Sequence, residues 1–375
     1  MHEEAVIAEL KAAGADMVVS LPCDRNKRLT DLLHEEMRVV DVTREEDGVG
    51  ICAGAYLVGG RPVMSIQSSG LGNMLNAMMS LTDCYKLPLP IIASWRGVDG
   101  EPIEAQVPFN SRIPALLEAY GILMYDVASA EDVPKVGEAV RTAYSEGRIA
   151  VVLIRPRLWE GAKRLPVEYP PRSRRVSVSV ERDVREPTMT RLGAIAEVMA
   201  CVGEDEIVVS NIGVPSKEVR ASRDRPLNFY MLGSYTQATP IGLGMALASD
   251  RRVTVIDGDG SLLGSSVFPV LSSERPENLT VVCMDNGTYG STGHQINQAY
   301  LDVDMGAVAA AYGIKDVRVA DTPGAIREAM SGRDGLRFVQ VPVLPGNSDS
   351  PNIPLKAAEI RDRFMGALRW TGPAG

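Results

Sequence analysis

The chain of 375 residues carries 39 Lys and Arg against 48 Asp and Glu, which gives a formal net charge of -9. This balance disfavours nucleic-acid binding, because a binder of that class needs a basic surface to displace counterions. No apolar run is long enough to cross a membrane, and the first residues are acidic. We therefore expect no signal peptide and a cytoplasmic protein. We also expect that the protein binds neither nucleic acid nor a membrane.

Short apolar, β-branched runs separated by helix-like stretches recur along the chain. In the first half a helix over 4–13 precedes runs at 17–21, 39–42, 63–66, 89–94, 122–127 and 150–154. In the second half a helix over 191–201 precedes runs at 207–210, 229–232, 253–256, 279–284, 317–320 and 338–341. Such runs predict parallel strands buried on both faces. The predicted fold class is therefore α/β, with two doubly wound parallel-sheet domains that share one topology.

The segment between the two halves is rich in Pro and in basic residues and lacks apolar periodicity. We predict a first domain over 1–160, a linker over 161–187 and a second domain over 188–375. An anion-binding arm is the alternative interpretation of this basic segment.

The inventory of metal-binding and reactive side chains excludes several kinds of site. The five cysteines are far apart and form no CxxC pair, which favours free thiols in a reducing compartment. Only three histidines are present, so a His-rich metal centre is excluded. Each Gly-x-Gly lacks the third glycine of a dinucleotide fingerprint, and no Gly-Lys pair of a P-loop occurs.

Two loops that follow neighbouring predicted strands combine residues suited to metal and phosphate. Gly258, Asp259, Gly260 and Ser261 follow the run at 253–256, and Asn286 and Thr288 follow the run at 279–284. Both loops should leave the carboxyl edge of the sheet, where open α/β sheets bind ligands. Asp and Asn oxygens suit Mg²⁺, and glycines let the backbone approach a pyrophosphate. Either loop alone would be interpreted as an ordinary turn.

Taken together, the GDG triplet and the Asn after the next strand resemble the signature of thiamine diphosphate enzymes. That resemblance implies a Glu after the second strand of the other half. Glu45 is found there, in a segment over 43–56 that is similar to the glycine-rich helix of the pyrimidine-binding domain. The resemblance assigns Glu45 to N1′ of the aminopyrimidine, whereas Glu46 is interpreted as a first-turn charge. Without the resemblance, both would be first-turn charges.

The chain has no room for the middle domain of the larger decarboxylases, and it resembles the sulfopyruvate decarboxylases, with their two subunits fused, and the phosphonopyruvate decarboxylases. Matching segments lie at 21–24, 44–59, 67–73, 95–97, 231–234, 256–260 and 290–295. The resemblance implies a pyrimidine (PYR) and a diphosphate (PP) domain, thiamine diphosphate, Mg²⁺, and decarboxylation of 3-sulfopyruvate to sulfoacetaldehyde in coenzyme M biosynthesis. Phosphonopyruvate decarboxylation is one alternative, and a non-catalytic scaffold or regulatory protein with the thiamine fold is another.

The same resemblance implies the remaining site residues. The residues assigned to the cofactor are Glu45, Gly213, Gly233, Ser234, Tyr235, Gly258, Asp259, Gly260, Ser261, Asn286 and Thr288. The metal ligands are Asp259, Asn286 and Thr288. Tyr235 stands where the family usually has Met, the residue that wedges the cofactor into its bent shape, so either the Tyr235 ring or a residue elsewhere would supply the wedge.

A small anionic 2-oxo acid also needs cations near its site. The candidates are Arg25, Lys27, Arg96 and His294, with solvated helix faces as the alternative for the first two. Asp24 and His294 are candidate proton donors, although Asp24 could instead cap the helix that starts near Asn26. Because relatives build their sites between chains, we expect a homo-oligomer, a dimer or higher.

Overall fold

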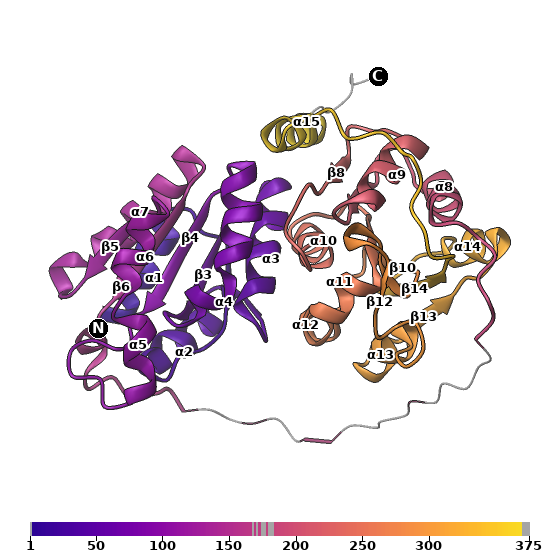
Figure 1. Cartoon of the computed structure of the whole chain (residues 1–375). Helices are drawn as coiled ribbons and strands as arrows, with labels where there is room; N and C mark the ends of the chain where they lie inside the picture. Colours follow the sequence, from indigo (N-terminus) through magenta and orange to yellow (C-terminus); the bar gives the residue numbers. More distant parts are fainter. Residues whose placement is uncertain (1, 167–168, 170–171, 174–177, 179–183, 370–375) are drawn as a thin grey trace. The chain divides into compact units, whose positions relative to one another are not determined.

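The computed structural model describes residues 2–166, 169, 172–173, 178 and 184–369. It consists of two compact units, Met1–Ser173 and Arg174–Gly375, each built on its own six-stranded sheet (Figure 1). The predicted linker over 161–187 lies partly outside the described residues. Within the described part of the chain, no helix has both the length and the apolar character needed to span a membrane.

The first sheet contains six parallel strands in the order β2-β1-β3-β4-β6-β5. Their bounds are β1 Met17–Ser20, β2 Arg38–Asp41, β3 Pro62–Gln67, β4 Leu89–Ser94, β5 Leu123–Val127 and β6 Ile149–Ile154. Every residue of β4 and β6 is buried, because helices cover both faces of a parallel sheet. The six predicted strands are confirmed to within one residue at each end.

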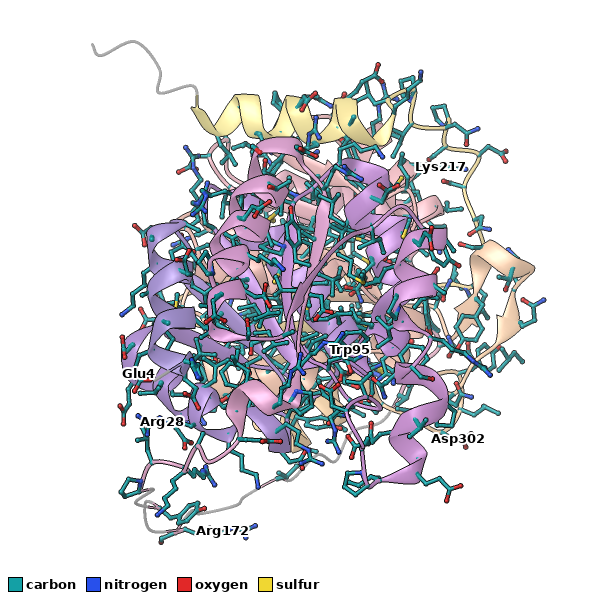
Figure 2. All side chains as sticks on the ribbon, turned by 90° about the vertical axis from the view of Figure 1, so that its left-hand side faces the viewer. Glu4, Arg28, Trp95, Arg172, Lys217 and Asp302 are labelled. Carbon is teal, nitrogen blue, oxygen red and sulfur yellow. The ribbon has the colours of Figure 1, made fainter. Side chains whose placement is uncertain are left out.

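Two groups of helices cover the two faces of this sheet (Figure 1). Its helices are α1 His2–Ala12, α2 Lys27–Glu36, α3 Glu45–Leu57, α4 Gly70–Ala77, α5 Val107–Asn110, α6 Ile113–Ala119 and α7 Pro134–Glu146. Val18 lies in the core with α1, α2 and α7, whereas its neighbour Val19 faces Gly48 of α3, as the alternation along a strand requires. Glu4 and Arg28, labelled one above the other in Figure 2, join α1 to α2 by a 2.7 Å ion pair.

The second sheet repeats this topology. Its strands are β7 Ile207–Ser210, β8 Asn228–Tyr230, β9 Val253–Gly258, β10 Leu279–Asp285, β13 Asp316–Val319 and β14 Arg337–Pro342. They are parallel, in the order β13-β14-β10-β9-β7-β8. Counted within each unit and from the opposite edge, this is the strand order of the first sheet. The prediction of two doubly wound domains with one topology is therefore confirmed.

The second sheet is also covered on both faces. Its helices are α8 Arg191–Cys201, α9 Val214–Ser222, α10 Ala238–Leu247, α11 Asp259–Gly264, α12 Val267–Glu274, α13 Met305–Ala311, α14 Pro323–Ala329 and α15 Ala357–Arg369. Helices α8, α9 and α14 pack together, and α10 packs on β7 and β9. A short antiparallel hairpin of β11 Thr288–Tyr289 and β12 Gln295–Ile296 follows β10.

The shared strand order determines where each unit can bind a ligand. In both sheets the direction of winding reverses between the first and the third strand of the unit. A crevice opens beyond the carboxyl ends of the strands at such a switch point. The loops after β1 and β3, and those after β7 and β9, therefore lie beside the expected sites.

Candidate functional site

Glu45 is the first residue of α3 and is buried, with 6% of its surface exposed. Asn73 of α4 donates from Nδ2 to Oε2 of Glu45 at 3.0 Å, whereas Oε1 has no hydrogen-bond partner within the described residues. Gly70 lies against the same carboxyl, because a Cβ built there would be 2.5 Å from Oε1. Glu46 instead pairs with Arg44 at 3.2 Å. The two neighbouring acids thus have different surroundings, and Glu45 presents one free oxygen.

Arg96, directly after β4, lies at the centre of an ionic cluster made of Asp24, Arg25, Gln67, Arg96 and Glu101. The Arg96 side chain is 2% exposed and binds Glu101 through Nε at 2.6 Å and Nη2 at 2.9 Å. Its Nη1 donates to Asp24 and, at 3.3 Å, to Gln67. The hydrogen bond from Arg96 holds the pKa of Glu101 down at about 2. The guanidinium thus already contacts two carboxylates.

The other predicted residues of this half lie around that cluster. Asp24 is half exposed and its carboxylate contacts Arg96. No side-chain cap is formed at the start of α2, so a capping role for Asp24 has no support. Arg25, one-third exposed, donates to Glu101 at 3.2 Å. Lys27 lies exposed on the first turn of α2.

The loop that brings Glu101 back to Arg96 has an unusual backbone. Gly97, Asp99 and Gly100 all have positive φ, at 73°, 51° and 76°, a region where glycine costs least. Asp99 is held by Arg155 at 3.1 Å, and the Arg155 guanidinium lies over the ring of Trp95 at 5.0 Å. The loop is therefore anchored at both ends.

The second unit contains a pocket of about 190 Å³ at its switch point. Its lining includes Asn211 and Ile212 after β7, 258–261 after β9, and Asn286 and Thr288 after β10. All six residues predicted for the two loops line it: Gly258, Asp259, Gly260, Ser261, Asn286 and Thr288. Gly213, with φ of 77°, directly precedes α9 and lies next to Ser291 of the same pocket. The predicted diphosphate loops thus converge on one cavity.

The three predicted metal ligands are buried together. Asp259, at the start of α11, accepts from Asn297 at 2.7 Å. Oδ1 of Asn286 accepts the backbone N–H of Thr288 at 3.1 Å. The Thr288 hydroxyl is buried and has no hydrogen-bond partner in the described part of the chain.

The surroundings of these residues fit a divalent cation. Burial raises the pKa of Asp259 and, together with the negative charge of Asp259, raises that of Asp285 to about 6. Among the described residues no group of three His, Cys, Asp or Glu could hold a metal ion. Mg²⁺ needs only one or two carboxylates, with neutral oxygens, water and phosphate completing its shell. One carboxylate, one amide and one unsatisfied hydroxyl therefore suit Mg²⁺.

Tyr235 forms another wall of the pocket. Its hydroxyl donates to the carbonyl of Gly260 at 2.6 Å, and its ring packs where a Cβ on Gly264 would stand. Burial raises the pKa of Tyr235 to about 12, so it stays neutral. Ser234 precedes it with a φ of 72° and a buried, unpartnered hydroxyl. Gly233, just before Ser234, is half-buried.

His294 lies on the β11–β12 hairpin with a φ of 63°. It is exposed, and its backbone N–H donates to the carbonyl of Tyr289 at 3.0 Å. Tyr289 lines the pocket, but His294 does not. The structure therefore places His294 outside the pocket lining, on the hairpin that contributes Tyr289 to it, and in a different unit from Arg25, Lys27 and Arg96.

Several residues of these sites are absent from the sequence prediction. Asn73 and Gln67 fall in a segment that resembles the family, but no pattern pairs them with Glu45 or Arg96. The one available signal for Glu101 as a partner of Arg96 is its place just after the glycines Gly97 and Gly100, which allow a tight turn. Asn297, which binds Asp259, and Arg191, which lines the pocket, carry no signal in the sequence that we can name.

Comparisons with known proteins agree with this geometry. Residues 2–111 match the family model "Thiamine pyrophosphate enzyme, N-terminal TPP binding domain", and residues 215–341 match "Thiamine pyrophosphate enzyme, C-terminal TPP binding domain". Thiamine pyrophosphate is another name for thiamine diphosphate. A benzoylformate decarboxylase structure from Polynucleobacter necessarius has a TM-score of 0.71 at 13% identity, covering 94% of this chain and 99% of that one. At that identity the likeness concerns the fold alone.

Closer relatives cover the whole chain. A sulfopyruvate decarboxylase of Methanosarcina acetivorans is 41% identical over 98% of this chain and 97% of its own. A phosphonopyruvate decarboxylase of Streptomyces viridochromogenes is 31% identical over 99% of this chain and 95% of its own.

In Methanothermobacter thermautotrophicus the two halves match separate proteins. Sulfopyruvate decarboxylase subunit beta is 44% identical over 48% of this chain and 96% of its own, and subunit alpha is 35% identical over 42% of this chain and 96% of its own. The single chain thus corresponds to the two subunits joined. It belongs to the sulfopyruvate decarboxylase family of thiamine pyrophosphate enzymes.

Proposed function

We propose that the chain decarboxylates 3-sulfopyruvate without oxidation, giving sulfoacetaldehyde and CO₂, with thiamine diphosphate and Mg²⁺. The observation that carries this proposal is the 41% identity to a sulfopyruvate decarboxylase along the full chain. In that family this reaction is a step towards coenzyme M. Because the cysteines are widely spaced, we also propose a cytoplasmic location.

Glu45 acts on the pyrimidine ring and the second unit holds the diphosphate. Asn73 orients the Glu45 carboxyl through Oε2, which leaves Oε1 to hold a proton at N1′ of the ring. Asp259, Asn286 and Thr288 hold Mg²⁺, while Gly213, Gly258, Gly260 and Ser261 let phosphate oxygens approach the backbone. When bound, the cofactor supplies the electron sink for the electron pair left by CO₂. Gly233, Ser234 and Tyr235 flank it, with Tyr235 as the wedge.

The substrate is a dianion and needs positive charge that is not already neutralised. Arg96 shares its guanidinium between Glu101 and Asp24, so it contributes orientation more than net charge. Arg25 is one-third exposed and pairs with Glu101 at 3.2 Å, whereas Lys27 lies exposed nearby. These two cations and His294 complete the proposed anion site. Asp24 or His294 then protonates the carbon that has lost CO₂.

The substrate assignment is tested by measuring CO₂ release from 3-sulfopyruvate and from 3-phosphonopyruvate under identical conditions. Sulfopyruvate should have the larger kcat/KM. A larger kcat/KM for phosphonopyruvate would favour phosphonopyruvate decarboxylation, the alternative supported by the 31% identity to a phosphonopyruvate decarboxylase. Absence of turnover with either acid, despite tight cofactor binding, would favour the scaffold alternative.

We also propose the domain boundaries 1–160, 161–187 and 188–375 and an assembly of at least two chains. The separate alpha and beta subunits of the relatives support two half-sites that meet by association. Co-expression of Glu45→Gln chains with Asp259→Ala chains tests where they meet. Sites between chains should regain part of the activity in mixed oligomers, because one site then receives both intact residues. No recovery in isolated mixed oligomers would place each site within one chain.

A further inference from the structure

Arg191 is a buried cation at the wall of the diphosphate pocket. It opens α8, is 6% exposed and lines the cavity together with Gly290 and Asn347. Among the described residues that line this pocket, it is the only Lys or Arg. A charge in this position needs a reason, because burying a guanidinium is costly unless its donors are paired.

Two of the three guanidinium nitrogens are already engaged. Nε donates to Glu218 at 2.6 Å, and Nη2 donates to Glu218 at 3.3 Å and to Asn347 at 2.9 Å. Glu218 is itself 1% exposed, so the plane of the guanidinium is set by a buried partner. The positions of the remaining donors are therefore determined before any ligand arrives.

The third nitrogen, Nη1, donates to no residue in the described part of the chain. It lies 3.6 Å from the position that a Cβ on Gly290 would occupy, and the absence of that Cβ leaves the nitrogen uncovered. Asn347 also donates to the carbonyl of Gly290 at 2.9 Å. Asn347 thus links Arg191 to the Gly290 loop, and the two N–H groups of Arg191 Nη1 stay free beside that loop.

We propose that Nη1 of Arg191 donates to a diphosphate oxygen of the cofactor and that Glu218 is the positioning residue for this contact. The inference rests on the proposed function, because that function supplies the diphosphate. An arginine N–H pair matches phosphate oxygens in charge and geometry. A diphosphate keeps negative charge after Mg²⁺ binds, and Arg191 is the cation placed to meet it.

The competing explanation is that Arg191 only ties α8 to α9 and to Asn347. The double variant Arg191→Gln/Glu218→Gln separates the two explanations, because it keeps a hydrogen-bonding pair of similar shape while removing both charges. Calorimetric titration in the presence of Mg²⁺ gives the Kd for thiamine diphosphate and for inorganic pyrophosphate. We expect both values to rise by about tenfold or more, as for loss of a charged hydrogen bond.

Two single variants serve as controls. Asn347→Ala removes the tether to Gly290 and one acceptor of Nη2 but keeps the cation and its Glu218 partner, so its Kd should rise by less than about threefold. Glu218→Gln keeps the cation but replaces the carboxylate that fixes its plane with a single amide acceptor, so its Kd should rise, by less than in the double variant. A melting temperature measured for each variant reports any loss of folding.

Wild-type affinity in the double variant would overturn the proposal. So would an equal loss of affinity in the double variant, Glu218→Gln and Asn347→Ala, because only a structural role predicts that. Since the readout is binding, a wild-type protein that binds the cofactor but does not decarboxylate sulfopyruvate would refute the proposed function and leave this inference standing.

Discussion

The close approach of Gly70 to Glu45 makes Gly70→Ala a test of how precisely the carboxyl must be placed. A Cβ at position 70 would lie 2.5 Å from Oε1 and 2.7 Å from Cδ of Glu45, whereas an ordinary contact begins at 3.4 Å. The carboxyl must therefore retreat by about 0.9 Å. Because a misplacement of about 1 Å at a reacting group can lower a rate by about 10²-fold, we expect kcat to fall by that order.

The assay is CO₂ release from 3-sulfopyruvate at saturating cofactor, with the cofactor Kd and the melting temperature measured in parallel. Gly366→Ala in α15 is the matched control, since a Cβ there meets nothing within 4 Å. It should leave kcat unchanged. If Gly70→Ala keeps kcat within about threefold of wild type, at unchanged cofactor affinity, then the position of Glu45 does not set the rate.

Three further changes test the remaining parts of the site. Glu45→Gln should abolish turnover while calorimetry still detects cofactor binding, and retained turnover would contradict the role of this carboxyl. Asp259→Ala should weaken thiamine diphosphate binding in the presence of Mg²⁺. The control Asp302→Ala, which removes an exposed carboxylate (Figure 2), should bind the cofactor as the wild type does. Equal cofactor affinities of the two variants would refute the metal site. Because Arg96 lowers the pKa of Glu101 from 4.5 to about 2, this pair stabilises the fold above about pH 4.5 and loses its effect as the pH falls towards 2. Glu101→Gln should therefore have a lower melting temperature than the wild type at pH 7, and this difference should shrink as the pH falls. A difference that grows on acidification would contradict the stabilising role of the pair.

Most strands were predictable because they are short apolar runs, the pattern of a parallel sheet covered on both faces, whereas the edge strands β2 and β13 contain exposed charged residues. The run 89–94 is the clearest case, since it coincides with β4 and all its residues are buried. The hairpin of β11 and β12 was not predicted, because two residues per strand leave no periodicity to detect.

The site was predictable where chemistry is carried by neighbours in sequence, as in Gly258, Asp259 and Gly260. It was not predictable where partners are brought together by the fold. Arg191 binds Asn347 across 156 positions, and no local pattern encodes that pairing. Arg96 is a third case. Its position after β4 was predicted, but its ion pair with Glu101 depends on the left-handed backbone at Gly97 and Gly100.

The identical strand order of the two sheets has a consequence for how such a chain could have arisen. Two domains with one winding pattern place their ligand-binding crevices at the same point of the fold. An ancestral domain would thus have needed only a few loop changes to specialise, one copy keeping a carboxylate for a heterocycle and the other keeping oxygens for a metal. The relatives with separate subunits make the two halves as two chains, whereas this chain makes them in equal number, because one polypeptide carries both.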